Sequence, residues 1–136
     1  MLQRKNREVA ELLLKLAEFG QLVTASLAEV ARHESLVSNT HLVVLCRLEL
    51  YGPQRPSDIM DVTGLTSGGV TKLIDRLVSA GWVERLDEPV PDDGRGVMVG
   101  LTPAGQESLQ SMVDVLAGRL GETREVVREI NRLLPD

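Results

Sequence analysis

The chain has 136 residues, 43% of them hydrophobic and 26% charged, which is the composition of one globular domain with a buried core. A net charge of −5 excludes binding to nucleic acid through overall charge, so any contact with DNA needs a local basic patch. Cys46 is the only cysteine, which excludes an internal disulfide. Charges interrupt the apolar N-terminal region, which argues against a signal peptide or a membrane span and favours a cytoplasmic protein.

A long amphipathic helix is predicted from Arg4 to about His33, because apolar residues recur there at steps of three and four. About 30 helical residues span roughly 45 Å, which is more than the core of so small a domain covers. We therefore expect part of the apolar face to contact a second chain. The apolar positions are Val9, Leu12, Leu13, Leu16, Phe19, Leu22, Val23, Leu27 and Val30.

Two shorter helices are expected next. The first covers about residues 40–50, with a polar N-cap within 38–40 and an end at the Gly-Pro pair 52–53. Ser57 has the hydroxyl oxygen that an N-cap needs, and we expect it to begin a helix that ends at Val62. Backbone amides at this N-terminus can bind a phosphate.

A turn at Gly64 is predicted to lead into a fourth helix, which begins at Thr66 or Ser67 and ends near Ala80. Apolar residues at helical spacing should anchor one face of this helix in the core. These residues are Val70, Leu73, Ile74 and Leu77.

A β-hairpin is predicted after the fourth helix. Residues 82–86 and 97–101 have the pattern of short strands, and the loop 87–96 between them contains two prolines and two glycines. Thr102 and a proline after it then begin a long terminal helix. The glycines at 118 and 121 each weaken that helix by about 1 kcal/mol and mark a bend or a close helix crossing.

Two helices joined by a tight turn and followed by a hairpin form a winged helix-turn-helix, in a fold that is mainly α (α+β). The second helix of such a motif reads bases from its N-terminal end. There Ser67 and Gly68 let the backbone come close to DNA. Thr71 can contact a base edge or a thymine methyl, Lys72 a guanine or a phosphate, and Arg76 a phosphate. The alternative is an ordinary amphipathic surface helix.

The chain resembles the MarR family of transcriptional regulators. The resemblance rests on residues 65–77, 81–85 and 101–105, and on the aspartate-x-arginine pair of Asp93 and Arg95. It implies a homodimer held together by the first and last helices and bound to a pseudo-palindromic operator. It also implies a crevice between the dimer helices and the DNA-binding lobe, in which a small-molecule effector can bind.

The resemblance divides the single domain of residues 1–136 into a winged helix DNA-binding lobe, 38–101, and dimerisation helices in 1–37 and 102–136. The resemblance makes Asp93 and Arg95 a pair in the wing, which is the predicted hairpin. It places Arg95 near the minor groove or in contact with Asp93, where it holds the shape of the wing. We expect a repressor that an effector releases. Together with Ser57, the expected DNA-binding residues are Ser67, Gly68, Thr71, Lys72, Arg76 and Arg95.

The charge balance departs from the family pattern. Gly94 stands where many members have a second arginine in the wing. From Arg55 to Arg85 the positive and negative charges of the side chains cancel. Because phosphate neutralisation drives much of DNA affinity, this predicts weaker binding at the wing and a shallow dependence of affinity on salt. The balance slightly favours the alternative function, a winged helix that binds proteins and does not bind DNA by itself.

No enzymatic centre, metal site or cofactor is predicted. No nucleophile lies in a pattern with a base, and His33 and His41 lack the further cysteine or histidine ligands of a zinc site. Cys46 lies among apolar residues of a helix, where an inert buried thiol is expected. Redox sensing by Cys46 is the alternative.

Overall fold

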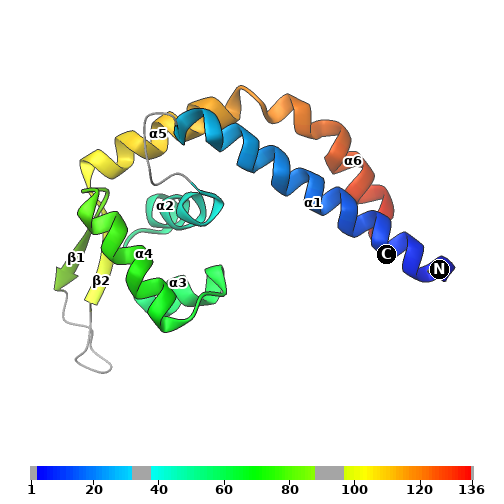
Figure 1. Ribbon diagram of the computed structural model, residues 1–136. Coiled ribbons are helices and arrows are strands. Elements are labelled where there is room, and N and C mark those ends of the chain that lie inside the picture. Colours follow the sequence, from blue (N-terminus) through cyan, green and yellow to red (C-terminus); the bar gives the residue numbers. More distant parts are fainter. Residues whose placement is uncertain (1–2, 32–37, 88–96, 136) are drawn as a thin grey trace.

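The computed structural model describes residues 3–31, 38–87 and 97–135. Its elements are α1 (Arg4–Ala31), α2 (Asn39–Tyr51), α3 (Pro56–Thr63), α4 (Ser67–Ser79), β1 (Val83–Asp87), β2 (Val97–Leu101), α5 (Pro103–Ala117), the 3-10 helix η1 (Leu120–Thr123) and α6 (Arg124–Leu133). Figure 1 shows a small lobe, formed by α2, α3, α4 and the strands, below a helical arm formed by α1, α5 and α6. The fold is the predicted mainly α winged helix-turn-helix.

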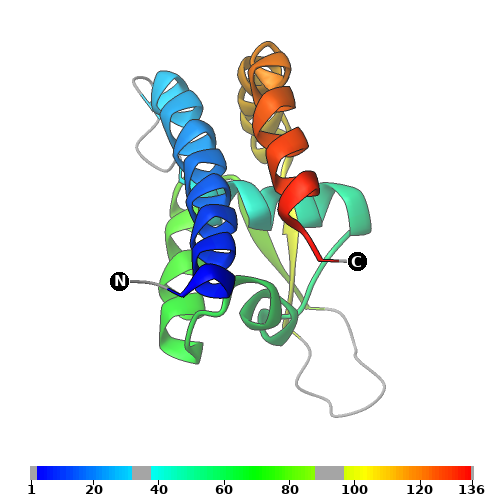
Figure 2. The same cartoon turned by 90° about the vertical axis from the view of Figure 1, so that its right-hand side faces the viewer.

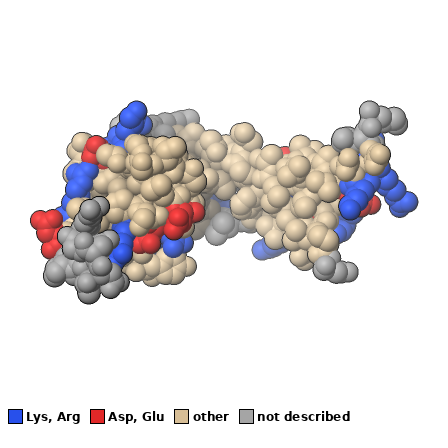
Figure 3. Space-filling model, turned by 90° about the horizontal axis from the view of Figure 1, so that it is seen from below, with Lys and Arg blue, Asp and Glu red and all other residues tan. Residues whose placement is uncertain are grey.

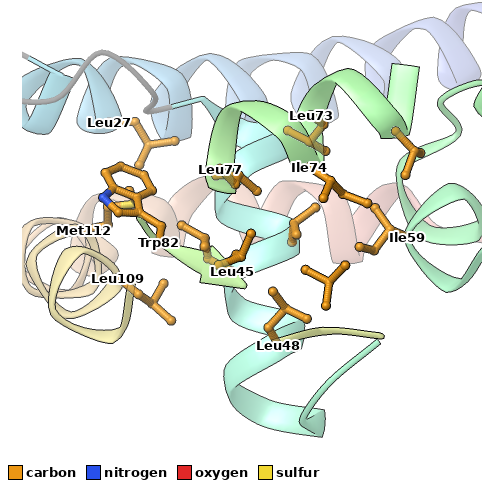
Figure 4. Close-up of a cluster of buried hydrophobic side chains, with 14 residues drawn as sticks. Leu27, Leu45, Leu48, Ile59, Leu73, Ile74, Leu77, Trp82, Leu109 and Met112 are labelled. Carbon is orange, nitrogen blue, oxygen red and sulfur yellow. The ribbon is translucent and has the colours of Figure 1, made fainter. Parts of the chain in front are cut away.

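The core of the lobe forms where α4 packs against α2, α3 and the sheet. The four apolar residues that the spacing of α4 singled out are all buried, and Leu77 is fully inaccessible. Figure 4 shows Leu73, Ile74 and Leu77 pointing into a cluster with Leu45 of α2 and Ile59 of α3. Burial of one such side chain stabilises the fold by about 1.5–3 kcal/mol. This packing fixes the rotation of α4 about its axis and leaves its opposite face in solvent.

The two strands form the predicted hairpin, in antiparallel register from Val83 opposite Leu101 to Asp87 opposite Val97. The strand before the wing begins one residue later than predicted. Trp82 stays outside it, because its amide donates to the carbonyl of Leu77, 3.0 Å away, and closes the end of α4.

A third segment joins this small sheet. The amide of Gln54 donates to the carbonyl of Val99 at 2.9 Å, and the amide of Val99 donates to the carbonyl of Gln54 at 2.7 Å. The segment between α2 and α3 is therefore held against β2, and α3 is positioned by the sheet as well as by the core.

The terminal helix is interrupted, as the glycine pair indicated. Helix α5 ends at Ala117, a 3-10 turn follows, and α6 runs back along α1, as Figures 1 and 2 both show. Gly118 ends α5 with ordinary helical dihedral angles, so its low helix propensity, and not a left-handed conformation, distinguishes this position. The arm is thus a layer of three helices and not a pair.

The start of α3 differs from the sequence prediction, and the end of α1 is not tested. Helix α1 is described to Ala31, and its expected end at His33 lies outside the described residues. The cap of α3 is a correction: Arg55 is the N-cap and Pro56 the first helical residue, so Ser57 lies inside the first turn. Proline is favoured at that position because its fixed φ suits a helix start and its missing amide would have no helical partner.

Candidate DNA-binding surface

The turn between α3 and α4 sets the direction of the exposed helix. Gly64 has a φ of 70°, in the left-handed region that glycine adopts without strain, and its amide donates to the carbonyl of Met60 at 2.9 Å. Two residues later Thr66 caps α4, because its hydroxyl oxygen accepts from the amide of Gly69 at 3.1 Å. The two caps end one helix and begin the next within a tight turn.

The predicted recognition residues of α4 lie on its exposed side. Ser67, Gly68, Thr71, Lys72 and Arg76 are all exposed, away from the buried stripe. Around Gly68 there is open space, because no atom lies within 4 Å of the place where a Cβ would stand. Among the described residues, no ion pair involves Lys72 or Arg76. The two cations are therefore available to an anionic partner.

The hydroxyl of Thr71 has a narrower role than the sequence suggested. It donates its proton to the carbonyl of Ser67, 2.9 Å away in the preceding turn. The oxygen can still accept a hydrogen bond, and the methyl group remains exposed for an apolar contact such as a thymine methyl.

The N-terminus of α3 offers fewer amides than predicted. The amides of Asp58 and Ile59 both donate to the carbonyl of Arg55, at 3.0 and 3.2 Å. The amide of Arg55 donates in turn to the carboxylate of Asp58 at 3.0 Å. Ser57 is exposed in this turn. It is not the N-cap, so only its hydroxyl group is available to a ligand.

An ion pair links α4 to the wing. The guanidinium of Arg85, on β1, donates to the carboxylate of Asp75, on α4, and both side chains are about half exposed. The sequence did not indicate this pair, because a contact across ten residues depends on how the strand returns along the helix. Figure 3 shows acidic and basic side chains next to one another over this lobe.

His41 lies in the first turn of α2. Its ring nitrogen Nδ1 lies 2.6 Å from the hydroxyl oxygen of Ser38, which also caps α2 by accepting from the amide of His41. Burial, and in second place the positive charge of Arg76, lower the pKa of His41. The guanidinium of Arg76 thus acts electrostatically on the imidazole, which the sequence did not indicate.

The base of the wing explains the sequence Leu-Thr-x-x-Gly at 101–105. The hydroxyl of Thr102 donates to the carbonyl of Gly81 and accepts from the amide of Gly105 at 3.0 Å. A Cβ at Gly105 would lie 1.9 Å from the carbonyl oxygen of Trp82, so only glycine fits. The wing residues Asp93, Gly94 and Arg95 lie outside the described residues.

Two other sequence predictions concern isolated groups. Cys46 is half-buried, and burial raises the pKa of its thiol, which disfavours the reactive thiolate. Within the described ranges no three His, Cys, Asp or Glu side chains gather as metal ligands would. The same ranges contain no helix with the length and apolarity that a membrane crossing requires.

Known proteins share this lobe. Residues 37–97 match the model of the MarR family. Over 69 residues the chain is 41% identical to the multiple antibiotic resistance protein MarR of Salmonella typhimurium, a match that covers 51% of this chain and 46% of that protein. The winged helix lobe of this chain is therefore similar to that of the MarR family. The chain spans about half the length of the curated MarR proteins it matches.

Solved MarR structures share the arm as well as the lobe. The apo form of MarR from E. coli has a TM-score of 0.66 at 24% identity and covers 99% of this chain and 88% of its own. A MarR variant from E. coli complexed with operator DNA has a TM-score of 0.63 at 27% identity, over 90% of this chain and 78% of its own. The arm, whose sequence the family model does not match, therefore keeps the MarR arrangement.

Proposed function

We propose that the chain is a sequence-specific DNA-binding regulator of transcription. It acts as a repressor, as a homodimer on a pseudo-palindromic operator. The observation that carries this is the exposed side of α4, on which Thr71 is exposed and Lys72 and Arg76 lie without an ion-pair partner among the described residues. The similarity to a MarR structure bound to operator DNA supports the same function. Ser57, Ser67, Gly68 and Arg95 complete the proposed DNA contacts.

The apolar surface of the arm supports a homodimer. Val9, Leu13 and Leu16 lie on one side of α1 and expose 49%, 59% and 46% of their surface. Val127 of α6 and Leu134, which follows that helix, are each 50% exposed. Apolar residues at helical spacing that find no cover within one chain fit an interface with a second copy. In this proposal the lobe of residues 38–101 binds DNA, and 1–37 and 102–136 form the dimer.

A dimer would present two copies of α4 to successive turns of the major groove, roughly 34 Å apart. The lobe contacts the arm through α1 and α5. A small molecule bound between lobe and arm would therefore change the spacing of the two α4 helices and shift the population away from the DNA-binding state. This is the proposed route of effector release.

Binding to the DNA upstream of the protein's own gene tests the proposal. Fluorescence anisotropy should show saturable binding that survives an excess of unrelated DNA. K72A/R76A should abolish it, because two phosphate or base contacts are lost from each of two protomers. R124A/R128A is the matched control, since it removes the same charge from exposed positions of the arm. Because α6 belongs to the proposed dimer arm, the mass of this variant is checked by sedimentation, and as a dimer it should still bind.

The salt dependence gives a second measurement. Lys72, Arg76 and Arg95, presented twice, amount to roughly six phosphate contacts, and the slope of log affinity against log salt should match that number. A slope that corresponds to about ten contacts would contradict this set of residues. If the wild type shows no sequence-specific binding, the proposal fails and a protein-binding winged helix takes its place.

A further inference from the structure

The ion pair between Asp75 and Arg85 stands where a DNA-binding helix reads bases. Asp75 follows Gly68, Thr71 and Lys72 by seven, four and three residues, so all four lie on the same side of α4. These are the spacings at which side chains of one helix reach base edges along a major groove. A carboxylate at this place is unexpected, because DNA phosphates repel it.

Arg85 reaches Asp75 because of the pleat of β1. It stands two residues after the buried Val83 and pairs in register with the buried Val99, so it lies on the sheet face that packs toward α4. Its guanidinium neutralises the carboxylate and donates to Oδ1. Among the described residues, no hydrogen bond to Oδ2 of Asp75 occurs. The pair thus presents a hydrogen-bond acceptor of fixed orientation without a net negative charge.

We propose that Asp75, oriented and neutralised by Arg85, is a specificity residue that accepts a hydrogen bond from the N4 amino group of one cytosine in each operator half-site. In the major groove, cytosine presents this amino group as a donor, and carboxylates are its usual side-chain acceptors. Lys72 and Arg76 supply charge, and Asp75 supplies discrimination between bases. The inference rests on the proposed function, because it requires that α4 enter the groove.

Selection of bound DNA from a random pool tests the inference, with the wild type and D75N selected in parallel. Asparagine keeps the size of aspartate and an oxygen that can accept from Arg85, and its added amino group favours adenine. D75N should therefore change the preferred base at one position of each half-site from cytosine to adenine. The preference at that position should change by about tenfold, the scale of one good contact to a base edge.

E84Q is the matched control. It removes the same charge from an exposed carboxylate one residue away from Arg85, on the other face of β1. The selected sequence should be that of the wild type. If D75N selects the wild-type sequence, or weakens all sequences equally, Asp75 does not read a base and the inference is wrong. If the wild type itself selects no sequence, the proposed function fails first, so the two failures are distinguishable.

The role of Arg85 is tested by combining variants. R85Q removes the positive charge that neutralises the Asp75 carboxylate. Because the DNA phosphates then repel that carboxylate, binding to the preferred site should weaken by more than tenfold. D75N/R85Q should recover part of that loss, because the uncompensated charge is gone. Effects of the two substitutions that simply add would show that Arg85 does not act through Asp75.

Discussion

Replacement of Gly105 by alanine should destabilise the protein severely for so small a change. The added Cβ would lie 1.9 Å from the carbonyl oxygen of Trp82 and 2.8 Å from its carbonyl carbon. This carbonyl already accepts the amide of Thr102 at 3.0 Å, so moving it away from α5 disturbs the base of the wing.

The size of the destabilisation caused by Gly105→Ala follows from two opposing effects. Inserting a methyl group into a well-packed site costs typically 1–3 kcal/mol, and a backbone contact belongs at the upper end because no side chain can rotate away. Alanine regains about 1 kcal/mol of helix propensity relative to glycine. We expect Gly105→Ala to lower the free energy of unfolding by about 2 kcal/mol or more.

Urea unfolding followed by far-UV circular dichroism measures this difference, at one fixed protein concentration because the proposed dimer would make stability depend on concentration. Gly68→Ala is the control, since a Cβ at Gly68 meets no atom within 4 Å. That variant should be as stable as the wild type or slightly more stable. If Gly105→Ala unfolds at the same urea concentration as Gly68→Ala, the close contact with Trp82 does not constrain the fold and the reasoning is refuted.

Three further predictions concern the arm, α2 and its histidine. Leu13→Glu places a charge in the exposed apolar face of α1, so it should shift the protein from dimer to monomer in sedimentation, and an unchanged mass would contradict the proposed interface. Cys46 should react slowly with iodoacetamide at neutral pH, because burial raises the pKa of its thiol; a rate equal to that of free cysteine would contradict this. In the folded protein the pKa of His41 lies below its ordinary value of 6.5. As pH falls, the unfolded chain therefore binds the proton first, and the free energy of unfolding should decrease below about pH 6.5. His41→Gln should remove that part of the loss, and Arg76→Ala should raise the pKa of His41 measured by NMR; an unchanged pKa would show that the two groups do not interact.

The sequence alone determined most of the elements and the exposed face of α4. Apolar spacing decides which side of an amphipathic helix is buried, and that spacing is a local property of the chain. The same is true of the Thr102 cap, because its contact joins residues only three apart, whereas the sequence left Thr66 and Ser67 open as the start of α4. The family resemblance followed from the same local patterns, since the residues that carry it lie in contiguous runs.

Tertiary structure decided what those residues meet. At the start of α3, Pro56 favours the first helical position and Ser57 favours the N-cap, and these two preferences cannot both be met. Propensities alone did not show that Arg55 would be the cap. The contacts of Asp75 with Arg85 and of Gly105 with Trp82 join separate elements whose approach is set by the return of β1 and the start of α5. Long-range packing, and not the order of residues, therefore decides which charges of α4 are available and which are already paired.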